Sequence, residues 1–387
     1  MANKSSSRPI YERIYETLRD EIKNRLYKAG DRIPSEKELA ESNGVSRITS
    51  KKVLELLAND GYILRQPGRG SFVADWEQGM TARHENFSPA TDTAKHHRSR
   101  FLVGLVITDF SESYGSELIY GMETASRENE AFLVVRRSFG VPELEEKAIK
   151  GMLDLGVDGL IILPAQGEYF NAEILKLVIN RFPVILIDRH LKGIAAGSVS
   201  TDNTEGAKKG TEYLFGLGHK HIAFLSPPPS DTTTIEDRIE GFVQAHAENG
   251  ITVDRDLWLN DIVSTLPTAY VQKNRQIDIE KIRSLLKSNP HITAIFAVEY
   301  NIALLAAAAA RDLGLKVPKD LSIMCFDCPD QGGVFPFTHV RQKQEEMGRV
   351  AFESVRKLKE GESVPNRINL DADLVLSTST GPAQASR

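Results

Sequence analysis

Near the N-terminus, apolar residues recur with the period of short amphipathic helices. From Ile10 to Leu26 they return every three or four positions with charged residues between them, which predicts one helix. A second helix is predicted to begin after Ser35, because Glu38 follows that N-cap at the spacing of a capping box. A third is predicted to begin at Ser46, with valine and leucines on its inner side.

The second and third helices are separated only by a short turn at Asn43-Gly44, which is typical of a helix-turn-helix. Residues 61–73 then form two β-prone triplets around Pro-Gly-Arg-Gly and predict a β-hairpin wing with Arg69 at its tip. The outer face of the third helix carries small polar and cationic side chains that can reach phosphates and base edges of DNA: Ser46, Arg47, Thr49, Ser50, Lys51 and Lys52. Taken singly, each of them also fits a solvated helix surface.

Beyond position 100 the pattern changes to short apolar runs separated by helical stretches. The runs are residues 101–107, 131–135, 158–163, 183–188, 221–225, 294–298 and 321–327. Continuous β-prone runs that alternate with helices are typical of parallel sheets covered on both faces. The length of this part favours two such sheets, with a ligand bound in the cleft at the carboxyl ends of the strands.

Charge and composition support a division into unlike domains. The 387 residues carry a net charge of −5, yet residues 1–75 hold 14 Lys and Arg against 11 Asp and Glu. A small basic module is therefore attached to an acidic body. Residues 77–100 have no apolar period, so we expect domains at 1–76 and 101–387 with a linker between them.

The same sequence argues against several other classes of protein. It has no run of about 18 apolar residues and no apolar stretch at its N-terminus, so we expect a cytoplasmic protein that does not bind membranes. Its two cysteines, Cys325 and Cys328, have CxxC spacing, but a zinc site needs four ligands and a redox motif opens a helix after an early strand. Incidental cysteines are favoured, and neither a metal nor a cofactor is expected.

Several N-terminal motifs in fixed order carry a family resemblance. Gly30-Asp-Arg-Ile-Pro-Ser-Glu-Lys-Glu-Leu-Ala, Gly44-Val-Ser-Arg-Ile-Thr and Gly68-Arg-Gly-Ser-Phe-Val resemble the winged-helix domain of the GntR family of bacterial transcription regulators. The resemblance implies binding to double-stranded DNA through the following positions: Lys37, Ser46, Arg47, Thr49, Lys51, Gly68 and Arg69. Lys51 stands where such domains often carry Arg, and Lys lacks the bidentate fork that favours guanine, so we expect Lys51 to contact phosphate.

Polar and charged residues gather after the apolar runs of the larger domain. Carboxylates, arginines and aromatic rings around one cleft suit a polyhydroxylated ligand, whereas each residue alone also fits a helix N-cap or an ion pair. Glycine-rich nucleotide loops, a Gly-x-Ser-x-Gly elbow and a His-Glu-x-x-His motif are all absent from the sequence, which weakens nucleotide-binding and enzymatic readings.

A second resemblance covers nearly all of residues 101–380. Gly104-Leu-Val-Ile-Thr-Asp, Pro183-Val-Ile-Leu-Ile-Asp-Arg, Ser200-Thr-Asp-Asn-Thr-Glu-Gly-Ala and Val317-Pro-Lys-Asp-Leu-Ser-Ile are similar to the effector domain of LacI/GalR regulators, which is related to periplasmic sugar-binding proteins. The resemblance implies effector contacts at Asp109, Ser111, Tyr114, Arg189, Asp202, Arg238, Glu299, Asp327 and Gln342. That family usually has Asn-Asp where this chain has Glu299-Tyr300. A buried glutamate needs hydroxyl or cationic partners, so we expect a small neutral sugar such as a pentose unless Arg189 or Arg238 compensates the charge of a phosphorylated one.

Together these patterns predict an α/β protein: a small α+β winged helix-turn-helix domain followed by two Rossmann-like subdomains of a periplasmic-binding-protein-like fold. The arrangement resembles that of the arabinose-repressor group. We expect a homodimeric repressor of sugar-utilisation genes that binds two-fold operator DNA under the control of a small carbohydrate. An activator of the same architecture and, from a different class, a carbohydrate-acting enzyme stay open as alternatives.

Overall fold

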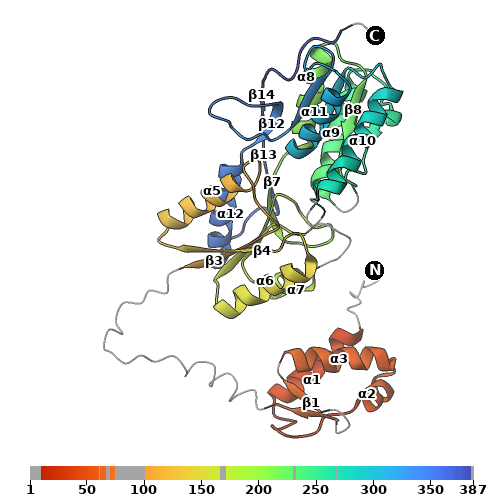
Figure 1. Ribbon diagram of the computed structural model, residues 1–387. Coiled ribbons are helices and arrows are strands. Elements are labelled where there is room, and N and C mark those ends of the chain that lie inside the picture. Colours follow the sequence, from red (N-terminus) through yellow and green to blue (C-terminus); the bar gives the residue numbers. More distant parts are fainter. Residues whose placement is uncertain are drawn as a thin grey trace, which may run out of the picture. The chain divides into compact units, whose positions relative to one another are not determined.

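The computed structural model describes residues 10–60, 62–66, 70–74, 101–165, 171–229, 232–266, 269 and 271–384. These residues fall into two compact units, one on either side of position 96 (Figure 1). The expected linker at 77–100 lies outside the described residues. In the described part of the chain, no helix combines the length and the apolarity needed to cross a membrane.

The first unit contains three helices and a two-stranded sheet. Its elements are α1 (Ile10–Lys23), α2 (Glu36–Asn43), α3 (Arg47–Asn59), β1 (Ile63–Gln66) and β2 (Gly70–Val73). Strands β1 and β2 pair antiparallel, which gives the predicted hairpin. As the sequence predicted, a short turn at Asn43-Gly44 separates α2 from α3. Gly44 ends α2 and adopts a left-handed backbone conformation.

The N-terminal caps of this unit follow the sequence pattern. Ser35 accepts a hydrogen bond from the Glu38 backbone, and the Glu38 carboxylate accepts one from the Ser35 backbone, so the capping box is complete. Ser46 caps α3 by accepting from the Thr49 backbone. The predicted extension of the first helix to Leu26 is wrong, because α1 ends at Lys23 and the Leu26 side chain is 72% exposed.

The second unit contains two six-stranded sheets, and each is the centre of one lobe. The N-lobe sheet has the order β13-β7-β6-β5-β3-β4. Its strands are β3 (Leu102–Ile107), β4 (Phe132–Arg137), β5 (Gly159–Ile162), β6 (Val184–Ile187), β7 (Gly197–Thr201) and β13 (Arg367–Leu370). All of its neighbouring strands run parallel, as the continuous apolar runs predicted.

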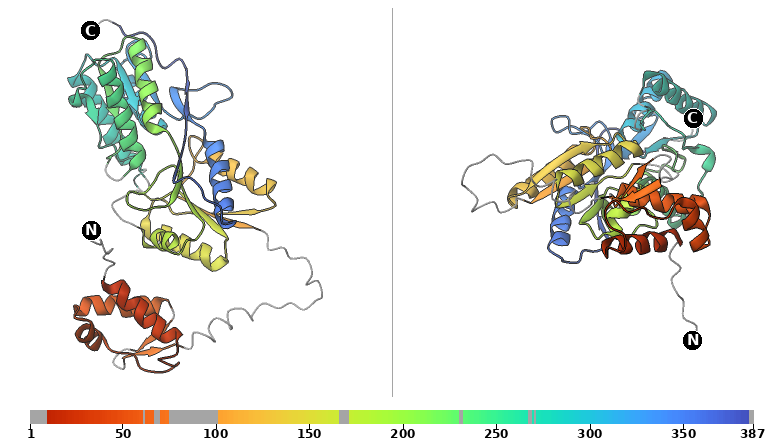
Figure 2. Two further views of the ribbon diagram at one scale, coloured as in Figure 1. Left: turned by 180° about the vertical axis from the view of Figure 1, so that it is seen from behind. Right: turned by 90° about the horizontal axis from the view of Figure 1, so that it is seen from below.

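Helices cover both faces of the N-lobe sheet. Helices α5 (Ser116–Glu128) and α12 (Gln344–Lys359) pack together on one face, where the views of Figures 1 and 2 show them side by side, and α6 (Pro142–Leu155) and α7 (Ala172–Ile179) cover the other. The side chains of β3 alternate accordingly, with Leu105 in the α5/α12 core and Val106 in the α6/α7 core.

The C-lobe sheet has the order β14-β12-β11-β10-β8-β9. Its strands are β8 (Ile222–Leu225), β9 (Trp258–Leu259), β10 (Ala294–Ala297), β11 (Ser322–Phe326), β12 (Thr338–Gln342) and β14 (Ala372–Val375). Helices α8 (Asn203–Gly216), α9 (Thr233–Glu248), α10 (Gln272–Ser288) and α11 (Tyr300–Asp312) pack with it. Only the edge strand β14 is antiparallel to its neighbour among the described pairs.

Within the described residues the chain crosses between the lobes at three points. It passes from β7 to α8 at Asp202, from β12 to α12 at Lys343 and from β13 to β14 at Asp371. The second and third crossings are tied together by an ion pair between Lys343 and Asp371. The carboxyl ends of the β-strands of both lobes are thereby directed toward the same region, between the two sheets.

Candidate functional site: a DNA-binding face and an interlobe cavity

The outer face of α3 carries most of the residues that the sequence predicted there, but Ser50 is fully buried and its hydroxyl donates to the Ser46 carbonyl of the preceding turn, so its predicted exposure is wrong. Arg47 is the first residue of the helix, and both it and Lys51 are exposed. The Ser46 hydroxyl lies 2.9 Å from the Thr49 hydroxyl, so both side chains are already engaged at the N-terminus of the helix. Arg47 has no ion pair among those recorded for the described residues, whereas Lys51 lies 3.9 Å from Glu55.

The remaining predicted DNA contacts are only partly placed. Lys37 is exposed on α2 and lies 3.8 Å from Glu41. Gly68 and Arg69, which the sequence predicts at the tip of the wing, lie outside the described residues. Within the hairpin, Arg65 forms ion pairs with Glu36 and Glu55, so this cation of β1 is neutralised by the two helices that flank it.

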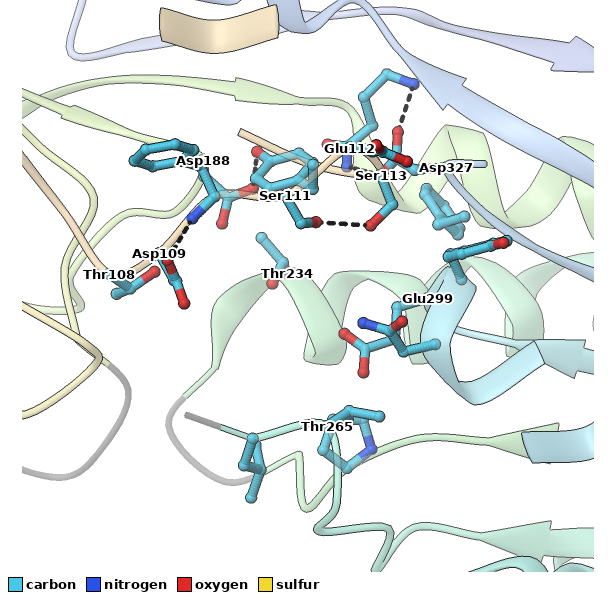
Figure 3. Close-up of a pocket in the computed structure, with 18 of the residues that line it drawn as sticks. Thr108, Asp109, Ser111, Glu112, Ser113, Asp188, Thr234, Thr265, Glu299 and Asp327 are labelled. Carbon is cyan, nitrogen blue, oxygen red and sulfur yellow. Dashed lines mark hydrogen bonds between the residues drawn. The ribbon is translucent and has the colours of Figure 1, made fainter. Parts of the chain in front are cut away.

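The second unit contains a cavity of about 660 Å³ between its lobes. Figure 3 shows Asp109 and Ser111 of the N-lobe across this space from Glu299 and Thr265 of the C-lobe. Its lining comes from the segments that follow β3, β6, β10 and β11, together with the start of α9. The cavity therefore lies at the carboxyl ends of parallel strands, where open α/β sheets bind ligands.

Eight of the nine residues predicted for effector contacts line this cavity. They are Asp109, Ser111, Tyr114, Arg189, Arg238, Glu299, Asp327 and Gln342. Asp202 is not part of the lining; its carboxylate caps α8 by accepting a hydrogen bond of 3.0 Å from the Glu205 backbone. The structure thus gives Asp202 the N-cap position that the sequence left open as an alternative.

Arg238 is the buried cation of the cavity, with 6% of its surface exposed. Its Nε donates to Asn203 Oδ1 at 2.8 Å and its Nη1 to the Val298 carbonyl at 2.6 Å, while the guanidinium lies 3.8 Å from the Phe326 ring centroid. Burial lowers the pKa of Arg238, and the nearby carboxylates of Asp327 and Asp188 oppose that effect. Arg238 is therefore held in place by protein groups.

Asp327 follows β11 and adopts a left-handed backbone conformation, with φ of 51°. Burial raises the pKa of its carboxyl to about 6, although Arg238 and hydrogen bonds from Gln342 and Gln344 favour the charged form. Gln342 Nε2 donates to Asp327 Oδ2 at 2.6 Å, and the Gln342 backbone donates to Oδ1 at 3.3 Å. This carboxylate is well supplied with donors.

Glu299 and Arg189 each keep a buried polar atom without a hydrogen bond. The Glu299 side chain is partly exposed to the cavity, but its Oε1 is sealed from solvent and has no partner; neither does the nearby Thr265 hydroxyl. Burial raises the pKa of Glu299; the Thr265 hydroxyl, which is close to the carboxylate but makes no hydrogen bond of ordinary geometry to it, and the charge of Arg238 oppose that effect. Arg189 contacts Asp188 through Nε and Nη2, which leaves its Nη1 buried and unpaired. Such groups are uncommon in folded proteins; this structure also has them away from the cavity, for example at Trp258 and Arg283, so they do not by themselves mark a ligand site.

Three aromatic residues, Tyr114, Phe110 and Phe139, form part of the N-lobe wall of the cavity. The Tyr114 hydroxyl donates to Asp188 Oδ1, and burial followed by the Asp188 charge raises the Tyr114 pKa well above its usual value. Phe110 and Phe139 are 42% and 41% exposed and line the cavity, and the Arg137 guanidinium lies 5.8 Å and 4.6 Å from their ring centroids. Their exposed faces are available to the apolar face of a ligand.

Sequence reasoning missed part of the lining. Thr234 and Ile235 at the start of α9, Thr265 in the loop before α10, and Gln331 after β11 all face the cavity. The run Thr232-Thr233-Thr234 after three prolines is typical of a helix start, although none was predicted there, and no local pattern shows which lobe this segment faces. Cys325 and Cys328 are free, buried thiols, and Cys325 Sγ lies 3.1 Å from the Asp327 carbonyl.

A winged helix-turn-helix with an exposed cationic helix, together with a two-lobed domain that encloses a polar cavity, defines a DNA-binding transcription regulator with an effector domain. Residues 10–73 match the model of the gntR family of bacterial regulatory proteins, and residues 211–380 match that of a periplasmic binding protein-like domain. The chain thus consists of a GntR winged helix-turn-helix domain and a periplasmic-binding-protein-like domain, as the sequence predicted.

Relatives of similar length support this class. The chain is 26% identical over 324 residues to the arabinose metabolism transcriptional repressor of Halalkalibacterium halodurans, which covers 82% of this chain and 80% of the relative. It is 25% identical over 366 residues to the protein of the same name from Geobacillus stearothermophilus, with 93% and 94% covered. These relatives are transcription regulators rather than enzymes.

Solved structures agree on the fold. Transcription regulator CcpA of Lactococcus lactis superposes with a TM-score of 0.63 over 73% of this chain and 99% of its own, at 23% identity.

Proposed function

We propose that the protein is a sugar-responsive repressor in which a small neutral carbohydrate in the interlobe cavity controls binding to operator DNA. The observation that carries this proposal is the lining of the interlobe cavity, in which carboxylates and arginines from both lobes, Asp109, Arg189, Arg238, Glu299 and Asp327, surround one space. Sugar hydroxyls both donate and accept hydrogen bonds, so one ligand of this class can pair with carboxylates and with arginines of the same lining. The names of the two arabinose metabolism repressors agree with this ligand class.

The charge of the cavity favours a neutral ligand. Five carboxylates line it, from Asp109, Glu112, Asp188, Glu299 and Asp327, against two arginines, Arg189 and Arg238. A phosphorylated sugar would bring further negative charge into this acidic site, where desolvated like charges repel. A neutral pentose or hexose avoids that cost and also presents C–H faces to Phe110 and Phe139.

We assign the eight cavity residues to effector binding, and Lys37, Ser46, Arg47, Thr49, Lys51, Gly68 and Arg69 to DNA binding. The proposed DNA-binding domain comprises residues 1–76 and the proposed effector domain residues 101–387, with a linker between them. The protein would act in the cytoplasm as a homodimer, whose two-fold symmetry matches that of an operator. The effector changes DNA affinity by the difference in its own affinity for the two states of the regulator, typically about 1–3 kcal/mol.

Thermal unfolding of the full-length protein tests the ligand class. Arabinose, other pentoses, hexoses, disaccharides and sugar phosphates are each added at millimolar concentration. A ligand present at about 100 times its Kd adds roughly 2.7 kcal/mol of stability and raises Tm visibly. We expect a neutral sugar to raise Tm and to release a labelled operator fragment. A shift with phosphorylated sugars alone would refute the neutral-sugar proposal, and tighter DNA binding with sugar would refute release by the effector.

A further inference from the structure

Gln344 lies at the second crossing between the lobes and is the first residue of α12. Its side chain is almost completely buried, with 5% of the residue exposed, although it is not part of the cavity lining. The amide makes hydrogen bonds in two directions. Its Oε1 accepts from the Gly115 backbone at 2.8 Å, and its Nε2 lies 3.3 Å from both the Ser113 carbonyl and Asp327 Oδ1.

On the N-lobe side, these bonds hold the loop that carries Ser111, Ser113 and Tyr114 into the cavity. Gly115 ends this loop as the N-cap residue of α5, with φ of 95°. A side chain cannot replace the glycine there, because a Cβ atom would lie 2.7 Å from the Phe110 Cβ. The Gly115 N–H is buried and needs an acceptor, which Gln344 provides.

On the C-lobe side, Gln344 meets the carboxylate of Asp327. Gln342, the last residue of β12, binds the same carboxylate through its side chain and its backbone. Gln342 stays within the C-lobe sheet, whereas Gln344 already belongs to a helix of the N-lobe. The hydrogen bond from Gln344 to Asp327 therefore joins the two lobes beside the cavity.

We propose that Gln344 is a positioning residue of the effector cavity, whose amide ties the 111–115 loop of the N-lobe to Asp327 of the C-lobe. The link holds polar groups from both lobes in the arrangement that receives the ligand. Preorganised groups bind more tightly because less ordering occurs on binding. The expected effect on effector affinity rests on the proposed function, whereas the hydrogen-bonded link between the two lobes does not.

The competing explanation is that Gln344 only satisfies the Gly115 N–H at the start of α5. Gln344→Glu separates the two roles. A glutamate keeps an oxygen for the Gly115 N–H and suits the N-terminus of a helix. It cannot donate to Asp327 when ionised, and it places a second carboxylate beside that residue. Gln344→Leu removes both roles, and Gln244→Leu, at a partly exposed position of α9, is the matched control.

Hydrogen–deuterium exchange of the ligand-free, full-length protein tests the link directly. In Gln344→Leu we expect exchange to rise at least several-fold in two segments, residues 111–118 and 326–328, and to stay unchanged in Gln244→Leu. In Gln344→Glu we expect the faster exchange at 326–328 to persist while the Gly115 region stays protected. Faster exchange confined to 111–118 in both Gln344 variants would overturn the link between lobes.

Calorimetric titration with arabinose tests the effect on the cavity. We expect both Gln344 variants to bind arabinose about tenfold more weakly than the wild type, and Gln244→Leu to bind it normally. Wild-type affinity in a folded Gln344→Glu protein would overturn the positioning role. If the wild type itself does not bind arabinose, the titration is made with the neutral sugar that raises Tm, and the exchange experiment still decides whether Gln344 joins the lobes.

Discussion

Replacing Glu299 with glutamine tests two effects of the buried carboxylate separately: its effect on the stability of the fold and its effect on the affinity for a ligand. Glutamine has the same shape without the charge. Burial raises the Glu299 pKa above its ordinary 4.5, so the folded protein keeps the proton to higher pH than the unfolded chain does. The charged carboxylate is therefore a net cost to the fold at neutral pH, and we expect Glu299→Gln to be more stable than the wild type there.

The size of the effect follows from the contacts of Glu299. Its Oε1 has no hydrogen-bond partner, and an incompletely satisfied buried group costs about 1–3 kcal/mol. Attraction to Arg238 and Arg189 offsets part of that cost. We expect a gain on the order of 1 kcal/mol in the free energy of unfolding at pH 8. A hydrogen bond from a sugar hydroxyl to a carboxylate exceeds one to an amide by about 1 kcal/mol, so effector affinity should fall roughly fivefold.

Urea unfolding of the full-length protein between pH 4 and pH 8 measures the stability difference, and titration with the effector measures affinity. Because the folded-state pKa is raised, wild-type stability falls as the pH rises through that pKa, whereas glutamine does not titrate. The advantage of Glu299→Gln should therefore grow from pH 4 to pH 8. The exposed Glu362 provides a control, Glu362→Gln, that we expect to show neither effect. A variant that is less stable than the wild type at pH 8 would refute the reasoning and identify Glu299 as a structural ion-pair partner.

Two further predictions concern DNA recognition and the packing of the N-lobe. Arg47→Ala should relax the base preference at one operator position, whereas Lys51→Ala should weaken binding to all DNA sequences and reduce the salt dependence of binding by about one counterion. Titrations with operator variants and at several salt concentrations measure both effects. An equal loss of affinity for all sequences in Arg47→Ala would show that Arg47 contacts phosphate. Gly121→Ala should destabilise the effector domain by about 1–3 kcal/mol in urea unfolding, because its Cβ would lie 2.0 Å from a backbone oxygen of α12. Gly151→Ala, in open space on α6, should instead leave stability unchanged or raise it by up to about 1 kcal/mol, and equal effects of the two would contradict the close helix contact.

Local patterns in the sequence determined the elements of both units. The capping residues Ser35 and Ser46 and the apolar period placed the helices of the first unit, because capping and amphipathicity depend on neighbours within one or two turns. The seven apolar runs became strands, and six of them are continuous because a strand buried on both faces needs a continuous apolar sequence, whereas β4 is a largely exposed edge strand. In the larger unit, β7, β9, β12, β13 and β14 escaped prediction; β7 contains polar residues, and β13 is an edge strand with alternating exposure.

Only the tertiary structure decided which distant side chains meet. Arg238, Glu299 and Asp327 stand far apart in the chain, and they line one cavity because α9, β10 and β11 bring their ends together. The sequence marked Asp202 and Asp327 alike as carboxylates after a strand, yet the first caps a helix and the second faces the cavity. Periodicity specifies which face of an element is buried, but contact between elements depends on sheet order and on where the chain crosses between the lobes. Gln344 owes its contacts to such a crossing, and for that reason its sequence neighbours gave no sign of them.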